Sequence, residues 1–277
     1  MTGQVVVSVP VAKRLIALAI YGMPEVREAR ERGKIVLKAG TTVAALAELF
    51  GVPPLRLGGR IAADGARTAK RLVEAPHIVL IEGGQWRCVD GCLAEELATM
   101  DSGDLFITGA NALDRHGTAG LMAGLAGGGA AGKALSMLNS EGIQTIVAVG
   151  LEKLIPGSIA DICRKAGRGR VDRSMGMAVG LLPLFGRVVT EKEALEMMTG
   201  AAVTVLGAGG VDGAEGATTM LVEGTEEQVD KAFALIAAQA GRPAVGAPES
   251  FASCGEGGYY CARHVGCIYR RRGKGDE

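Results

Sequence analysis

The chain has 277 residues, and its 30 basic and 30 acidic side chains cancel at neutral pH. This balance gives no support for a nucleic-acid partner or an acidic membrane surface, and a chain of this length can bury a large core without disulfide bonds. Glycine is unusually frequent, at 43 residues, whereas aromatic residues make up only 4%. Because the glycines lie between apolar segments, they indicate turns of a packed protein rather than a disordered linker.

The start of the sequence lacks the basic, apolar and cleavage regions of a signal peptide. Its longest early apolar run, residues 15–20, is too short to span a membrane. We therefore expect a cytoplasmic protein with no membrane partner, and we expect it to form a homo-oligomer. In the cytoplasm the six cysteines are expected to be thiols or metal ligands rather than disulfides.

The first part of the chain alternates short β-branched runs with amphipathic stretches, which predicts βαβ units around a mostly parallel sheet. Helices are expected at residues 13–31 (broken near Gly22 and Pro24), 43–50 and 93–100. Strands are expected at residues 35–37, 55–57, 78–81, 105–108 and 145–149.

The pattern changes after about Gly186 to strand, helix, strand, strand and helix. These elements are expected at residues 187–189, 191–198, 203–206, 219–222 and 226–240. Their order is typical of a small α+β sandwich of ferredoxin-like type. The sequence thus predicts three parts: an α/β domain with an open, mostly parallel sheet over residues 1–186, an α+β domain over 187–247, and a cysteine-containing segment with a charged tail over 248–277.

Three glycine turns follow predicted strands, at the edge where open parallel sheets bind their ligands. They are Gly40-Thr41-Thr42, Gly109-Ala110-Asn111 and Gly150-Leu151-Glu152-Lys153. A fourth loop, residues 127–133, opens an alanine-rich helix and contributes Gly128, Gly129 and Lys133. Glycine lets backbone N–H groups approach an anion, and hydroxyl and lysine side chains add donors. Any one turn could be only a tight bend, but four at one edge predict a crevice for a small anionic metabolite.

Several segments also carry a family resemblance. They are IVLKAGTTVAALAELFG and LRLGG at residues 35–51 and 55–59, GDLFITGANALD at 103–114, AGGGAAGKAL at 126–135 and VGLEK at 149–153. Together they resemble the ribose-5-phosphate isomerase/CoA-transferase-like superfamily, including its sugar-phosphate-sensing and lactate-utilisation members. The resemblance implies an isomerase-like α/β fold, a small ferredoxin-like lid and a site for a phosphorylated, carboxylated or CoA-linked metabolite.

The sequence departs from this superfamily at the positions that would catalyse isomerisation. The isomerase has a glutamate base just before its loop lysine, where this chain has Gly132 before Lys133. The acidic pair that follows Gly-Ala in the isomerase is replaced by Asn111 and Ala112. Without these carboxylates the proton transfer has no base, so the resemblance implies the anion site but not the isomerase reaction.

Two catalytic candidates and one alternative site remain. CoA transferases use a glutamate nucleophile, which makes Glu152, with Lys153 beside it, the candidate for chemistry; otherwise the chain is a sensor or scaffold that binds without turnover. Near the C-terminus, Cys254, Cys261, His264 and Cys267 form a C-x6-C-x2-H-x2-C pattern. Thiolate and imidazole ligands at these separations could close a tetrahedral zinc site, or the segment could be a reduced tail in a metal-free protein. A further alternative for the function of the chain is a metal- or redox-linked module formed by this Cys/His cluster.

Overall fold

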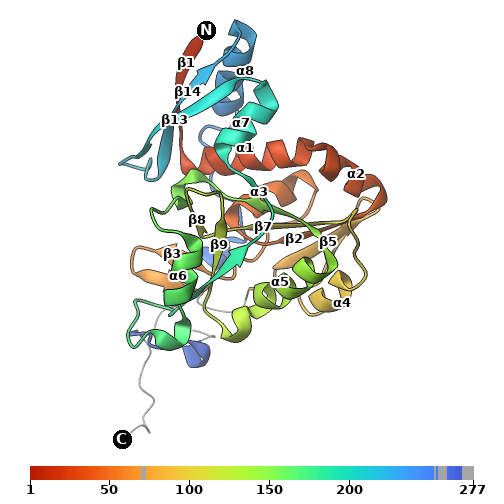
Figure 1. Ribbon diagram of the computed structural model, residues 1–277, viewed down its shortest axis with the longest axis vertical. Helices are drawn as coiled ribbons and strands as arrows, with labels where there is room; N and C mark the ends of the chain where they lie inside the picture. Colours follow the sequence, from red (N-terminus) through yellow and green to blue (C-terminus); the bar gives the residue numbers. More distant parts are fainter. Residues whose placement is uncertain (70–72, 253, 255–260, 270–277) are drawn as a thin grey trace, which may run out of the picture.

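A six-stranded sheet lies at the centre of the larger part of the molecule (Figure 1). The computed structural model describes residues 1–69, 73–252, 254 and 261–269. From one edge to the other the strands are β12 (Arg187–Val189), β10 (Gln144–Ala148), β7 (Leu105–Gly109), β2 (Lys34–Lys38), β5 (Ile78–Glu82) and β6 (Gln85–Cys88). The first four are parallel to one another, whereas β5 and β6 run antiparallel to their neighbours.

The order of the strands in this sheet indicates where along its edge a ligand site is expected. Counted in chain order from β6, the strands follow the order 3-2-1-4-5-6, which is that of doubly wound α/β sheets. In such sheets the direction of winding reverses between strands 1 and 4, and ligands bind beyond the carboxyl ends of the strands at that point. Here β5 and β6 are antiparallel, so no crossover winds on that side, but the strand order changes side at the same reversal point, between β2 and β7.

Helices cover both faces of the large sheet. Alternate residues of a strand point to opposite faces, so Ile35 and Leu37 of β2 pack beneath α1 (Val9–Gly22) and α3 (Thr41–Leu49). Val36 faces the other side, where α4 (Leu93–Leu97) and α5 (Gly129–Glu141) cover it. The predicted break after α1 is confirmed, because Met23 separates it from α2 (Pro24–Arg32), whose first residue is a proline that a helix start tolerates.

A second, smaller sheet is antiparallel and lies beyond α1 (Figure 1). Its strands are β1 (Thr2–Val7), β14 (Ala217–Glu223) and β13 (Ala202–Gly209), and its helices are α7 (Glu191–Thr199) and α8 (Glu226–Ala237). One hydrophobic core runs from Val5 and Met220 of this sheet, through Leu15 and Ile20 of α1, to Ile107 of β7. The two sheets therefore share a core.

The sheets cross the domain boundary that was predicted at residue 186. β1, at the start of the chain, pairs with β14, and β12, just beyond the boundary, pairs with β10 of the large sheet. The sequence shows where strands lie but not which distant strand each one joins, and pairing between distant strands determines this architecture.

Shorter elements surround the carboxyl edge of the large sheet. They are the hairpin β3 (Arg60–Ala62) and β4 (Gly65–Arg67), the sheet β8 (Ala112–Leu113), β9 (Ala119–Ala123) and β11 (Gly180–Leu184), the helix α6 (Ile159–Lys165), and the 3-10 turns η1 (Ala126–Gly128), η2 (Leu151–Lys153), η3 (Arg168–Arg170), η4 (Pro248–Phe251) and η5 (Cys261–Arg263). None of the helices described has both the length and the apolar character needed to cross a membrane.

Most predicted elements are confirmed, with one clear error. Residues 55–57 form no strand; Leu55 and Leu57 are buried, but their backbone bonds go to the segment near Ser250 rather than to a sheet. The apolar residues indicated burial correctly, and burial alone does not distinguish a strand from an extended loop. Strand β1 was missed, and the strand predicted at 78–81 is present but antiparallel.

Candidate functional site

The carboxyl ends of β2, β7 and β10 open into one cavity of about 650 Å³. This volume is typical of small-molecule sites. The cavity lies at the reversal point of the large sheet, where a Cβ built on Gly40 would lie 3.9 Å from the Cα of Gly109. The predicted site residues that line it are Gly40, Thr41, Thr42, Gly109, Asn111, Gly128, Gly129, Glu152 and Lys153. The three predicted strand-end turns therefore line one cavity in the described structure.

Lys133 is the exception among the predicted ligand-binding residues. It is exposed and does not line the first cavity, because it lies one helical turn into α5 while the start of that helix faces the sheet edge. It lines a second cavity of about 900 Å³, together with Arg168 and Arg263. The two cavities adjoin, since Gly129, Ala130 and His264 line both.

The glycines around the cavity are of two kinds. Gly40 has an extended backbone that any residue adopts, and Cβ atoms on Gly40 and Gly109 would make only ordinary contacts. Folding does not require glycine at these two positions, so their effect is to keep the cavity open. Gly128 is different, because its φ of +76° favours glycine and a Cβ there would lie 2.7 Å from a methyl group of Leu182.

Gly132 lies in the first turn of α5, directly before Lys133. A Cβ at this position would lie 1.9 Å from the carbonyl oxygen of Gly127, so the loop as folded leaves no room for any side chain. The local backbone therefore requires glycine at position 132.

We expect Gly132→Ala to lower the free energy of unfolding by about 1–3 kcal/mol, because the loop must move to admit the methyl group. Gly22→Ala is the matched control: Gly22 also lies in a helix, and a Cβ there meets nothing within 4 Å. Urea unfolding curves of both variants measure the difference. Equal stability of the two variants would show that the loop adapts freely.

Positive charge exceeds negative charge around the first cavity. Among the described residues that line it, the cations are Lys13, Lys38, Arg56, Arg60 and Lys153, and the carboxylates are Asp90 and Glu152. Arg56 pairs with Asp90 at 2.7 Å, and the Lys153 ammonium group lies 3.9 Å from Glu152. His77 and His264 add no charge at neutral pH, because burial lowers the pKa of each. The cavity is therefore suited to an anion.

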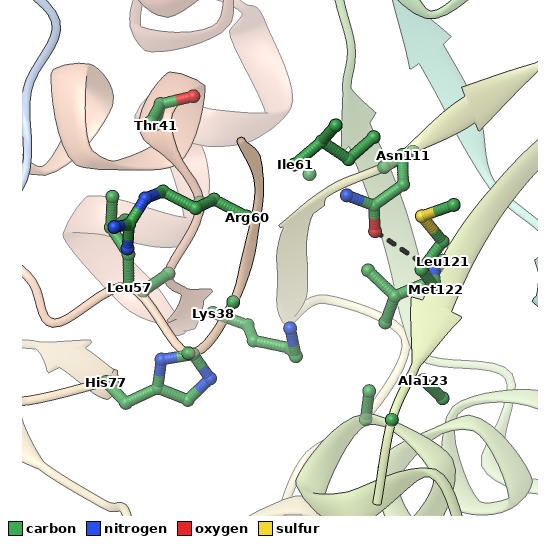
Figure 2. A pocket seen from close by; sticks show the side chains of 18 of the residues that line it. Lys38, Thr41, Leu57, Arg60, Ile61, His77, Asn111, Leu121, Met122 and Ala123 are labelled. Carbon is green, nitrogen blue, oxygen red and sulfur yellow. Dashed lines mark hydrogen bonds between the residues drawn. The ribbon is translucent and has the colours of Figure 1, made fainter. Parts of the chain in front are cut away.

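Lys38 is the most enclosed of these cations. It is the last residue of β2, only 7% exposed, and Figure 2 shows its side chain extending between His77 and the β9 residues Leu121 and Met122. Burial lowers the pKa of its ammonium group to about 8. Lys38 was not among the predicted site residues, although a lysine at the end of a buried strand is a signal that could have identified it.

His77 was also missed, and it lies beside Lys38 because β5 is antiparallel. The start of an antiparallel strand lies at the same edge as the ends of β2 and β7, and His77 directly precedes β5. Its ring nitrogen Nδ1 lies 2.8 Å from the carbonyl oxygen of Arg56. A carbonyl can only accept, so Nδ1 carries the proton and Nε2 holds a lone pair. Burial, with the charge of Lys38 adding to it, lowers the pKa of His77 to about 4.

Asn111 supplies a fixed polar group from the opposite wall. Its Oδ1 accepts a hydrogen bond from the backbone N–H of Met122 at 3.0 Å (Figure 2). Because the oxygen is held by β9, the amide nitrogen is left as a donor toward the cavity. Asn111 thus offers the cavity a hydrogen-bond donor rather than a carboxylate, which suits an anionic ligand.

The third wall of the cavity, beside those that carry Lys38 and Asn111, is formed by η2 and presents Glu152 and Lys153. The Oε2 atom of Glu152 is buried and has no hydrogen-bond partner within the described part of the chain. The carboxylate lies so close to Gly150 that a Cβ on that glycine would be 1.9 Å from Oε2. Lys13 of α1 lies near both groups: burial lowers its pKa, the charge of Glu152 opposes this effect, and the charge of Lys153 adds to it.

Glu191 anchors this wall from behind. It is 1% exposed, and its carboxylate accepts the N–H of Leu151 at 3.0 Å and the hydroxyl of Thr218 at 3.3 Å. Burial raises the pKa of this carboxyl group to about 7, against the effect of these hydrogen bonds, and the nearby charge of Glu152 adds to the increase. The turn that carries Glu152 is therefore tied to both α7 and β14.

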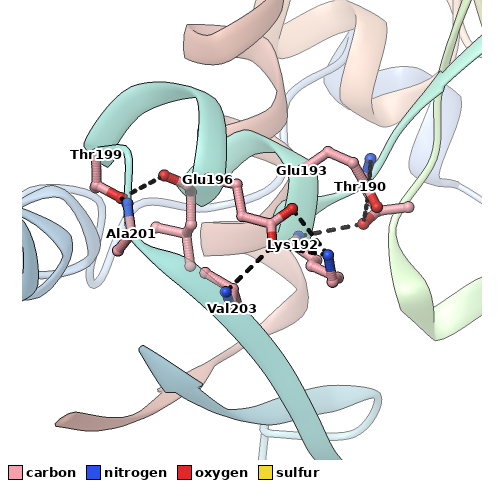
Figure 3. Close-up of polar contacts among 8 residues, drawn as sticks. Thr190, Lys192, Glu193, Glu196, Thr199, Ala201 and Val203 are labelled. Carbon is pink, nitrogen blue, oxygen red and sulfur yellow. Dashed lines mark hydrogen bonds and ion pairs between the residues drawn. The ribbon is translucent and has the colours of Figure 1, made fainter. Parts of the chain in front are cut away.

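The helix that carries Glu191 is itself held firmly at both ends (Figure 3). Thr190 and Glu193 form a capping box at its start. Further along, Glu196 accepts the ammonium group of Lys192 at 2.8 Å and the backbone N–H of Val203, in β13, at 3.1 Å. Helix α7 is thus a fixed support between the small sheet and the crevice.

The predicted metal ligands are not assembled into a site. Among the described residues, no three histidine, cysteine, aspartate or glutamate side chains gather in a way that could hold a metal ion. Cys254 is buried against Arg67, and His264 is buried at the boundary of the two cavities with its Nε2 unpartnered in the described structure. Zinc binding by Cys254, Cys261, His264 and Cys267 stays a prediction, which metal analysis of the purified protein can test.

Sequence comparisons add no relative. No protein-family model matches the chain, and no curated protein matches it significantly. The functional argument therefore rests on the geometry and chemistry of the crevice.

Proposed function

We propose that this chain binds a small anionic metabolite, carrying a phosphate or carboxylate group, in the crevice at the ends of β2, β7 and β10. One observation carries the proposal: a cavity of ligand size at the reversal point of the sheet, around which lysine and arginine outnumber carboxylates by five to two among the described lining residues. The first turn of α3 begins at Thr41 and directs backbone N–H groups toward this space.

The proposal includes kinship with the ribose-5-phosphate isomerase/CoA-transferase-like superfamily, with the small sheet as a ferredoxin-like unit. What supports this is the position of the glycine turns at three successive parallel strand ends, where the resemblance implies them. The metabolite would then be a sugar phosphate, an organic acid or a CoA ester. We propose that the chain converts its ligand rather than only binding it, because Lys38, His77 and Glu152 bring three groups capable of chemistry to one cavity.

We expect at least one of ribose 5-phosphate, acetyl-CoA, pyruvate and inorganic phosphate to raise the melting temperature of the wild-type chain. A ligand at a hundred times its dissociation constant stabilises the folded state by about 2.7 kcal/mol. Gly40→Ala should fold normally, because its backbone suits any residue, yet lose most of this response, because its methyl group lies where the ligand must approach α3.

Gly22→Ala serves again as the control and should respond as the wild type does. Two results would contradict the proposal. One is the absence of a shift with every compound, and the other is a Gly40→Ala variant that responds to the active compound as strongly as Gly22→Ala.

A further inference from the structure

We propose that Lys38 forms a Schiff base with a carbonyl group of the bound metabolite, so that the ligand is a small oxo compound with a phosphate or carboxylate group. The inference rests on the proposed function and names the ligand's reactive group. The observation behind it is that the amine of Lys38 is buried within the proposed anion-binding cavity.

The position of Lys38 is fixed by the sheet. It pairs in register with Ile78 of β5 and Thr108 of β7, so the backbone on both sides of it is held. Its side chain is more than nine-tenths buried and lines the cavity. The groups around it include His77, which is neutral, and the Arg56–Asp90 pair, in which the carboxylate already has a cation. In the described structure the Lys38 amine therefore lies in the cavity with no carboxylate paired to it, and it is available to a ligand.

The neutral form of the amine is the nucleophile, and Lys38 is suited to supply it. With a pKa of about 8, about one tenth of the Lys38 amine is uncharged at pH 7. The other two lysines that line the cavity in the described structure, Lys13 and Lys153, both lie near a carboxylate, that of Glu152, which is 3.9 Å from the Lys153 ammonium group and opposes the lowering of the Lys13 pKa by burial. Of the three, Lys38 has the surroundings that favour attack.

The reaction needs no other reactant. The amine nitrogen of Lys38 attacks the carbonyl carbon, and a C–N bond forms as the C–O π bond opens to a hydroxyl group. Loss of that hydroxyl then leaves the C=N bond, and the carbonyl oxygen departs as water with the two protons that the amine carried. The neutral His77 side chain lines the same cavity and its Nε2 holds a lone pair, which makes it the candidate to pass the proton from nitrogen to the departing oxygen.

The anionic end of the ligand has its own place close to this amine. Helix α3 starts three residues after Lys38, and its free N–H groups and those of the Gly40 turn favour a phosphate or carboxylate. Asn111 adds a donor from the other wall. A short oxo compound can therefore reach both the helix start and the Lys38 amine.

Reductive trapping tests the inference directly. The full chain is incubated with glycolaldehyde phosphate in one arm and glyoxylate in the other, in the presence of cyanoborohydride, which reduces only the C=N bond once formed. Peptide mass spectrometry then locates the adduct. We expect one equivalent of adduct on Lys38 in at least one arm, and the arm that reacts identifies the anionic group. Lys38→Arg, which keeps the charge, should lose the adduct, whereas Lys231→Arg, an exposed control on α8, should retain it.

The outcomes separate the two proposals. Melting temperatures are measured with the same compounds without reductant, where stabilisation reports binding alone. Stabilisation without an adduct on Lys38, or an adduct spread over exposed lysines, overturns the Schiff-base inference and leaves the anion site standing. If none of the anions gives either stabilisation or an adduct, both the anion site and the Schiff-base inference are contradicted. Circular dichroism and melting of Lys38→Arg establish that the variant is folded.

Discussion

Lys38→Met is expected to make the free protein more stable at pH 7 and to abolish anion binding. Each tenfold change in an ionisation constant corresponds to about 1.4 kcal/mol. The lowering of the Lys38 pKa from 10.5 to about 8 therefore means that holding this charge in the folded chain costs about 3 kcal/mol. Methionine has a similar length and no charge, so it removes that cost together with the cation that the ligand needs.

The pH dependence fixes the sign of this effect. Below pH 8 Lys38 is charged in both the folded and unfolded states, and the full cost is present. Between pH 8 and 10.5 only the unfolded state keeps the proton, so the wild type gains stability as pH rises. The advantage of Lys38→Met should therefore shrink over this interval, as urea unfolding curves at successive pH values would measure.

Lys34→Met provides the matched control for Lys38. Lys34 lies on the same strand and the same face, but its ammonium group bonds to Thr99 near the surface. We expect a change of at most about 0.5 kcal/mol and normal anion binding. A Lys38→Met variant that is less stable than Lys34→Met, or that still binds anions as the wild type does, would contradict the account of this residue.

Glu191→Gln is expected to remove a fall in stability between pH 4.5 and 7. Burial raises the pKa of Glu191 to about 7, so over this interval the folded state keeps a proton that the unfolded state has lost. Stability of the wild type therefore falls as pH rises, by up to about 3 kcal/mol. Glutamine keeps an acceptor for Leu151 and cannot ionise, so the variant should exceed the wild type in stability by an increasing margin up to pH 7.

Glu226→Gln is the control for this measurement. Glu226 is the first residue of α8, as Glu191 is of α7, but it is exposed. Its pH profile should follow that of the wild type. Parallel profiles for Glu191→Gln and Glu226→Gln would show that Glu191 has an ordinary acidity and would remove the anchor assigned to the third wall.

The crevice was predictable because its signals are local. A glycine turn directly after a β-branched run places Gly40, Gly109 and Gly150 at strand ends, and parallel strands bring their ends to one edge. Lys133 was misplaced because helix phase decides its direction, and the phase depends on where α5 begins. A shift of one or two residues at a helix start turns a side chain to another face.

The chemistry of the crevice was less accessible from the sequence, because it depends on pairing between distant segments. His77 reaches Lys38 only because β5 runs antiparallel to β2, and Glu191 reaches Leu151 only because β12 joins the large sheet. No periodicity within either segment encodes these pairings. The buried polar groups are thus products of topology, whereas the glycine turns are visible in the sequence itself.

The most direct test of the anion site is a crystal structure of the full chain soaked with inorganic phosphate. The account predicts phosphate density between the start of α3 and the Gly109 turn, within hydrogen-bond distance of the Asn111 amide nitrogen or the Lys38 ammonium group. Density in the second cavity beside Lys133 and Arg168, with only water at the end of β2, would contradict it.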